Sequence, residues 1–159
     1  MVHIHRRIAR AYDGEMSIRE FKVKVVVPAP VQEVWNELVT WQNQGNWMAL
    51  TQVSSSQIGP EDSGVGTTID AFTGIGKIGV IDRMRIVEWQ PPYFCKVDHY
   101  GKIIKGIGTF TLSNKNGATV FDWYEEIQAP RAVLVFIKPF ILIAVYVSLR
   151  KFARTFTPR

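Results

Sequence analysis

The segment at residues 132–149 is almost wholly apolar and is followed by a basic tail, and it sets the strongest limit on the fold. A helix that spans a membrane needs about 20 consecutive apolar residues, whereas this stretch is 18 residues long and contains Lys138 and Pro139. A lysine within a span costs about 2.5–3.5 kcal/mol, and the apolar piece that follows Pro139 is too short to cross a bilayer. The segment therefore predicts a long helix that is covered by the rest of the chain.

The covering layer is predicted to be a β-sheet. Residues 50–129 show no helical periodicity and many turn signals, of which Asn114–Gly117 is typical of a hairpin. Strand-forming runs lie between the turns, at residues 50–58, 65–73, 77–89, 93–100, 103–113 and 118–128. Their spacing indicates an antiparallel meander. A curved sheet of this kind can wrap around a helix and rarely fills its own middle, so the arrangement predicts an internal cavity.

The beginning of the chain adds one strand and two short helices. Residues 18–27 alternate between apolar and charged side chains, which indicates a half-buried strand, so that about seven strands are predicted. Two prolines end this strand and open a short helix, and Asn46–Met48 indicates a second helical turn. Residues 1–17 lack the apolar core of a secretory signal and are predicted to form an arm or a short helix. No linker divides the remainder, so residues 18–159 are predicted to form one domain.

Several kinds of chemical site are not expected. The chain has one cysteine, Cys95, so it can form neither an intrachain disulfide nor a cysteine-based metal cluster, which favours the reducing cytoplasm. Its three histidines are too scattered for a metal site. Gly74–Gly79 resembles part of a dinucleotide-binding loop, but it joins two predicted strands and no helix follows. No serine lies in a nucleophile elbow. The sequence therefore predicts no metal and no cofactor.

The net charge of +5 is unevenly distributed. Six basic residues and no acidic residue follow Glu126, whereas residues 1–126 carry 13 basic and 14 acidic side chains. A field of this kind attracts anionic surfaces such as lipid headgroups. A solvated helix end that complements the helix dipole explains the same residues. Because the basic residues are not interleaved with aromatic ones and no nucleic-acid-binding module is present, binding to nucleic acid is not expected.

Short motifs along the chain carry a likeness to a known superfamily. They are Pro30–Trp35, Trp47–Met48, Gly64–Thr67, Glu88–Pro92, Gly117–Thr119 with Trp123, and Pro130–Arg154 with its Lys138–Pro139 pair. In their order and spacing, the chain resembles the helix-grip (SRPBCC) superfamily of START lipid-transfer domains and birch-pollen-allergen-like proteins, and within it the bacterial polyketide cyclase/dehydrase type. The resemblance implies an α+β fold in which a curved antiparallel sheet of about seven strands wraps around a long C-terminal helix, with two short helices after the first strand.

Two features depart from the pattern of these relatives. Thr40 stands after the first helix where aspartate is common, and the final helix is far more apolar than the arginine-rich version that is usual. The resemblance therefore implies a cavity for a hydrophobic ligand, such as a lipid, polyketide, isoprenoid or quinone, without identifying which. It does not imply cyclase chemistry, because the family includes many proteins that only bind.

Strand parity identifies side chains that should face this cavity, because alternate residues of a strand point to the same side. On the last strand, Phe121, Trp123 and Ile127 assign one face inward, and Glu125 shares that face. The predicted cavity residues are Thr67, Ile69, Ala71, Met84, Ile86, Val97, His99, Phe110, Leu112, Phe121, Trp123, Glu125, Ile137, Ile141 and Val145. Gly106 and Gly108 are predicted to leave room beside them.

Glu125 and His99 are the one inward-facing ionisable pair that this assignment predicts. A carboxyl group in an apolar pocket has a raised pKa because desolvation disfavours its charged form, and an imidazole within reach can exchange protons with it. There are alternatives: the two side chains orient a ligand, they form a buried ion pair, or Glu125 lies in water at the mouth of the strand.

The C-terminal helix is predicted to have two different faces. Ile141, Val145, Leu149, Phe152 and Phe156 form a stripe that should face the sheet. Ile143 and Val147 lie on another face that continues into Arg150 and Arg154, which is typical of a homodimer contact or of peripheral contact with an anionic membrane. Pro139 is predicted to kink the helix and is a candidate hinge for ligand entry.

Three functions remain open from the sequence. The favoured one is binding or transport of a hydrophobic small molecule in the cavity. The second is an enzyme of the polyketide cyclase or dehydratase type, in which Glu125 and His99 act as acid and base. The third is an adaptor that contacts the inner face of a membrane through its basic C-terminal helix. Under each of these functions the protein is expected to be a monomer or a homodimer.

Overall fold

A computed structural model describes residues 16–157, apart from the side chains of Met16, Ala132, Val133, Phe136, Ile137 and Phe140. Residues 1–15 of the predicted N-terminal arm lie outside the described part, as do residues 158–159. The last two residues of that predicted arm, Met16 and Ser17, already belong to the first strand.

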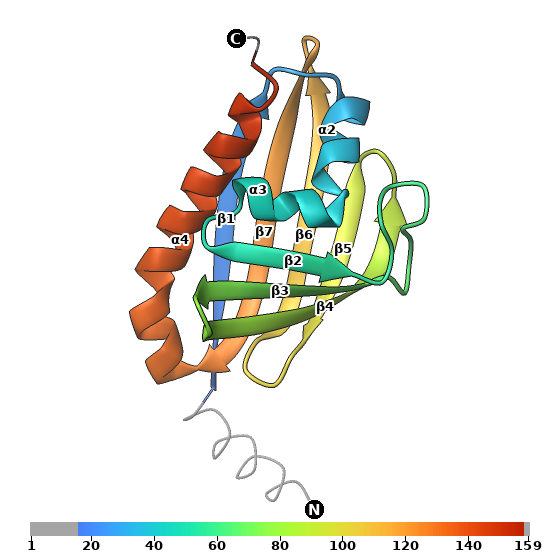
Figure 1. Ribbon diagram of the computed structural model, residues 1–159. Helices are drawn as coiled ribbons and strands as arrows, with labels where there is room; N and C mark the ends of the chain where they lie inside the picture. The colour runs from blue at the N-terminus through green and yellow to red at the C-terminus, as the bar shows by residue number, and fades with distance from the viewer. Residues whose placement is uncertain (1–15, 158–159) are drawn as a thin grey trace, which may run out of the picture.

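Seven strands form a single antiparallel sheet with a long helix along it (Figure 1). The elements in chain order are β1 (Met16–Val27), α2 (Val31–Leu38), the 3₁₀ turn η1 (Trp41–Asn43), α3 (Gln44–Trp47), β2 (Thr51–Ser55), β3 (Thr68–Ile75), β4 (Ile78–Gln90), β5 (Phe94–Tyr100), β6 (Lys105–Lys115), β7 (Ala118–Pro130) and α4 (Arg131–Arg154). The strand order is β1-β7-β6-β5-β4-β3-β2. The predicted α+β class, the strand meander and the two short helical segments are confirmed.

The two neighbouring strands β1 and β7 form the side of the sheet against which α4 packs. β1 pairs with β7 from Met16↔Pro130 to Val27↔Thr119, so the end of β7 lies beside the start of β1. Because α4 begins directly after Pro130, it runs back along β1 and packs mainly against that strand, as Figure 1 shows.

Two local features help the sheet to curve. The register between β4 and β5 shifts between Ile86 and Glu88, and a bulge of this kind bends a strand and increases its twist. Gly106 in β6 has a φ of +133°, and a Cβ atom there would overlap the backbone carbonyl of Glu126. Only glycine fits this position without strain.

The buried side chains form two clusters that α4 helps to cover. The larger includes Trp35 and Trp47 of the short helical segments and Phe152 of α4. The smaller joins Phe21 of β1 to Leu134 near the start of α4. Because aromatic side chains each bury roughly 150–250 Å², the larger cluster is the main stabilising core. Members of both clusters line the cavity described below, so the cavity lies where the two clusters meet.

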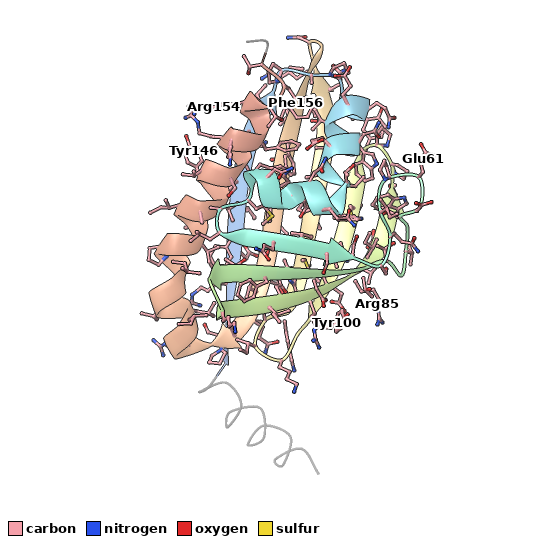
Figure 2. All side chains as sticks on the ribbon, in the orientation of Figure 1. Glu61, Arg85, Tyr100, Tyr146, Arg154 and Phe156 are labelled. Carbon is pink, nitrogen blue, oxygen red and sulfur yellow. The ribbon has the colours of Figure 1, made fainter. Side chains whose placement is uncertain are left out.

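The two predicted faces of α4 are present. Leu149 and Phe152 of the predicted stripe are fully buried, whereas Ile143 and Val147 are 64% and 52% exposed. Figure 2 shows Tyr146 and Arg154 on the outer side of α4, pointing away from the sheet. None of the helices in the described part of the chain combines the length and apolar character that crossing a membrane requires. Peripheral membrane contact, homodimer contact and a hinge at Pro139 stay predictions.

Candidate functional site

A cavity of about 260 Å³ lies between the sheet and α4. Its walls are inward-facing side chains of β1 and β3–β7, the segment from η1 to the start of β2, the loop between β5 and β6, and α4 from Leu134 to Ser148. Most of these side chains are apolar. The cavity is therefore suited to an apolar molecule, and its volume lies just below the usual range for drug-sized ligands of about 300–1,000 Å³.

Most of the side chains predicted to face the cavity lie on its wall. These are Ile69, Ala71, Met84, Val97, Phe110, Trp123, Glu125, Ile141 and Val145. Seven of them come from five strands, and strand parity places these on one side of the sheet. Ile141 and Val145 come from α4.

Five other predicted residues face inward but do not line the cavity. Ile86, Leu112 and Phe121 pack in the larger core cluster, Thr67 is buried just before β3, and His99 is buried beside Glu125. Strand parity gives the face on which a side chain lies, but not how far along the strand the empty space extends. Here the helix α2, with Trp35, fills that end of the sheet. The side chain of Ile137 lies outside the described part of the chain.

Parts of the cavity wall come from elements that the prediction left out. Phe21 and Val23 of β1, Met48 after α3, and Ile103 and Ile104 of the β5–β6 loop all line the cavity. The alternation of β1 pointed to Phe21 and Val23, whereas the contribution of a loop cannot be read from a periodic pattern.

The polar end of the cavity is a buried cluster of three ionisable side chains. His99 on β5 is 3% exposed. Its Nδ1 lies 2.9 Å from both carboxylate oxygens of Asp82 on β4. Its Nε2 lies 3.5 Å from Oε2 of Glu125 on β7, but the two are not aligned for a hydrogen bond. His99 is thus held between two carboxyl groups that both line the cavity.

Asp82 was missed by the sequence prediction, although a signal was present. Asp82 has the same strand parity as Met84 and Ile86, both of which were assigned inward. Its partner could not be read from the sequence, because that requires the register Met84↔His99 between β4 and β5. That register places His99 one inward position along from Asp82.

Glu125 has a second partner on its own strand. The indole Nε1 of Trp123 donates a hydrogen bond to Oε1 of Glu125 at 2.9 Å. Gly108 on the neighbouring strand β6 is paired with Glu125. A Cβ atom added to Gly108 would lie 3.1 Å from His99 Nε2 and 3.3 Å from Glu125 Oε1. The missing side chain at Gly108 therefore gives the two ionisable groups the space that they occupy.

Burial and mutual attraction act in opposite directions on this cluster. Burial by itself lowers the pKa of His99, but the negative charges of Glu125 and Asp82 and the hydrogen bond that His99 donates to Asp82 outweigh it and raise the pKa to about 9. Burial raises the pKa of Glu125 above its ordinary value, although His99 and the Trp123 hydrogen bond oppose the rise. At neutral pH the imidazole is therefore protonated and paired with Asp82, and burial favours the protonated form of Glu125.

The other polar groups on the wall are used within the protein. The Gln44 side chain donates to the carbonyl of Leu38, and the hydroxyl of Thr51 bonds to Ala49 O and to Thr73. The hydroxyl of Ser148 accepts from the backbone N–H of Ala49. No lysine or arginine of the described residues lines the cavity.

The Cys95 thiol and possible metal ligands are the other groups that bear on chemistry. Cys95 is buried, and burial raises the pKa of its thiol to about 12, so it is an unreactive core side chain. Within residues 16–157, no group of three or more His, Cys, Asp or Glu side chains is placed so as to hold a metal ion.

By sequence, the chain matches no protein-family model and no curated protein. By structure, it is similar to many solved proteins. The di-domain ARO/CYC StfQ from the steffimycin biosynthetic pathway superposes with a TM-score of 0.68 at 12% identity, covering 94% of this chain and 53% of StfQ. Norcoclaurine synthase from Thalictrum flavum, solved with dopamine and hydroxybenzaldehyde, superposes with a TM-score of 0.61 at 12% identity. The match covers 88% of this chain and 87% of the synthase. The Aha1 dimer from Colwellia psychrerythraea superposes with a TM-score of 0.65 at 13% identity, and the match covers 87% of this chain and 96% of the Aha1 chain.

These likenesses establish the fold. The curved seven-stranded sheet, the two short helical segments after β1 and the long C-terminal helix superpose on these structures. The chain therefore has a helix-grip fold, which is the fold that its sequence motifs predict.

Proposed function

We propose that this protein binds or carries an apolar small molecule in the cavity between the sheet and α4. The observation that carries the proposal is the cavity itself: about 260 Å³ of space, walled mainly by apolar side chains, with its ionisable groups gathered in one cluster. Apolar pockets with a few convergent polar groups are the usual form of small-molecule sites. The small volume favours a compact molecule, of the size of a small polyketide, isoprenoid or quinone, over a long-chain lipid.

Filling the cavity should weaken binding. Ala71 is 6% exposed and lines the cavity from β3, so the added ring of Ala71→Phe would occupy the space intended for a ligand. We expect this variant to bind the neutral fluorescent probe N-phenyl-1-naphthylamine at least 10-fold more weakly than the unaltered protein. The measurement is a fluorescence titration with the probe.

A matched control adds the same side chain outside the cavity. Val26 is 56% exposed on β1, so Val26→Phe should leave the affinity for the probe unchanged. If the unaltered protein does not bind the probe, or if Ala71→Phe binds it equally well, the cavity is not the binding site and the proposed function is wrong.

A second candidate function is acid–base catalysis, and the Asp82–His99–Glu125 cluster favours it. Asp82 fixes the imidazole through Nδ1, and Glu125 lies on the cavity wall where a ligand would touch it. A carboxylate placed in this way can remove a proton from the carbon next to a ligand carbonyl, giving an enolate that is reprotonated at the same carbon. Positioned bases of this kind contribute roughly 10²–10⁴-fold to a rate.

Deuterium exchange tests this candidate without knowledge of the natural substrate. We expect the protein to accelerate the exchange of the α-protons of 1-tetralone in D₂O, and Glu125→Gln to return the rate to that of buffer. Proton NMR follows the exchange. Glu126→Gln is the matched control, because Glu126 lies on the opposite face of β7 and should keep the full rate. Exchange at the buffer rate with the unaltered protein would remove the catalytic candidate while leaving the binding function in place.

A further inference from the structure

The charge on the cavity wall narrows the class of ligand, given the proposed binding function. Asp82 and Glu125 are the ionisable side chains of the described residues that line the cavity, and both are acids. Their carboxyl groups are largely buried, with side-chain exposures of 20% and 14%. Their cationic partner among the described residues is His99, which lies behind them and is fully enclosed.

Among the described residues, the groups of the cluster that line the cavity, Asp82 and Glu125, offer hydrogen-bond acceptors, whereas the N–H groups of His99 are enclosed behind them. The Nδ1–H of His99 faces Asp82, its Nε2–H faces Glu125, and the indole N–H of Trp123 is used by Oε1 of Glu125. A carboxylate has about four acceptor positions, so each of the two acids retains unused ones. A ligand group that reaches this end of the cavity therefore meets acceptors.

The cluster can also accept one more positive charge. When both carboxyl groups are ionised, the protonated imidazole between them leaves a net charge of −1, and burial then favours either a proton on Glu125 or a cation beside it. Buried charge without a counter-charge is costly, and a partner that supplies the opposite sign is correspondingly favoured. Electrostatic attraction of this kind is strong because the surrounding walls are apolar and the effective dielectric constant is low.

His99 shows that the cluster is not satisfied by itself. Its Nε2 is fully buried and has no hydrogen-bond partner, because Glu125 Oε2 is 3.5 Å away and poorly aligned. Buried polar atoms of this kind are rare in folded proteins.

We propose that the ligand is an apolar amine, whose protonated nitrogen lies against Glu125 and Asp82 and whose apolar part fills the cavity beneath α4. An ammonium group supplies that positive charge and up to three donors for the free acceptors. A ligand with a carboxylate head, such as a fatty acid, is disfavoured, because it would add a third negative charge beside two buried acids.

Three probes of the same size and shape separate the head groups. We expect 1-naphthylmethylamine, which is protonated at pH 7, to bind at least 10-fold more tightly than 1-naphthalenemethanol, and 1-naphthoic acid to bind more weakly than the alcohol. Isothermal titration calorimetry at pH 7 measures all three. Equal affinity for amine and alcohol, or preference for the acid, would overturn the amine proposal and leave the cavity-binding function standing. Failure of all three to bind would count against both.

The Glu125→Gln variant assigns the preference to the cluster. We expect it to lose at least 10-fold in affinity for the amine and to stay within 2-fold for the alcohol, since glutamine keeps the shape and the acceptor for Trp123. Glu126→Gln, on the outer face of the same strand, should keep both affinities. Circular dichroism checks that each variant is folded, and Asp82→Asn provides a second test should Glu125→Gln not fold. An unchanged amine preference in the folded variant would show that the cluster does not bind the ligand's nitrogen.

Discussion

Phe152→Ala is expected to lower the free energy of unfolding by about 3–5 kcal/mol, the usual cost of deleting a buried aromatic side chain. Phe152 is fully buried. Its ring centroid lies 4.8 Å from that of Trp47, the last residue of α3, and 5.9 Å from that of Phe121 on β7. One side chain thus joins α4, the short helical segment and the sheet, so its loss leaves a cavity that no single neighbour can fill.

The predicted loss is large relative to the stability of a domain, which is typically about 5–15 kcal/mol. Urea unfolding followed by tryptophan fluorescence measures it, because Trp47 reports on the same contact. Val147→Ala is the matched control on the same helix: Val147 is 52% exposed, and surface substitutions usually change stability by less than about 0.5 kcal/mol. A loss below about 1 kcal/mol for Phe152→Ala would mean that α4 does not depend on this cluster.

The position of α4 could be predicted because its sequence has two unlike faces. Leu149 and Phe152 recur at helical spacing and are buried, whereas Ile143 and Val147 lie on the opposite face of the helix and are exposed. The strands could be predicted for a similar reason, since alternation in β1 and β7 sorts side chains between the two faces. Periodicity can be read from a short stretch of sequence, and the faces of α4, β1 and β7 depend only on such short stretches.

The extent of the cavity could not be predicted, because it depends on which elements meet over the sheet. Leu112 and Phe121 face the same way as Phe110 and Trp123, yet the first two pack in the core and the second two line the cavity. The difference is the covering element: α2 contacts the sheet near the first pair. No pattern within β6 or β7 encodes where α2 lies.

The ionisable cluster could be predicted only in part. The pair Glu125 and His99 followed from strand parity, and the structure places their side chains 3.5 Å apart. Asp82 required in addition the register of β4 against β5, which results from the hairpin geometry and the bulge near Val87. Strand parity indicates the face of the sheet on which each residue lies, but the pairing of Asp82 with His99 depends on the register between the strands.

The stability of the protein is expected to fall as the pH rises from 6.5 to about 9, by on the order of 3 kcal/mol from His99 alone. The sign follows from the protons bound in each state. The pKa of His99 is about 9 in the folded protein and near its ordinary value of 6.5 when unfolded, so between these values the folded state holds a proton that the unfolded state has released. Its stabilising contribution is complete below pH 6.5 and is lost as the pH passes 9.

The variant His99→Gln isolates this contribution. It should be less stable than the unaltered protein at pH 6, because Asp82 and Glu125 lose the cation between them, and its stability should change much less between pH 6.5 and 9. Urea unfolding at a series of pH values gives both slopes, and NMR of the imidazole ring gives the titration midpoint directly. Glu125 acts in the same direction, because its raised pKa makes the folded state bind a proton more tightly as well. An imidazole midpoint near 6.5, or equal slopes in the two proteins, would show that His99 is not held between charged carboxylates, and the electrostatic basis for binding an amine would be lost with it.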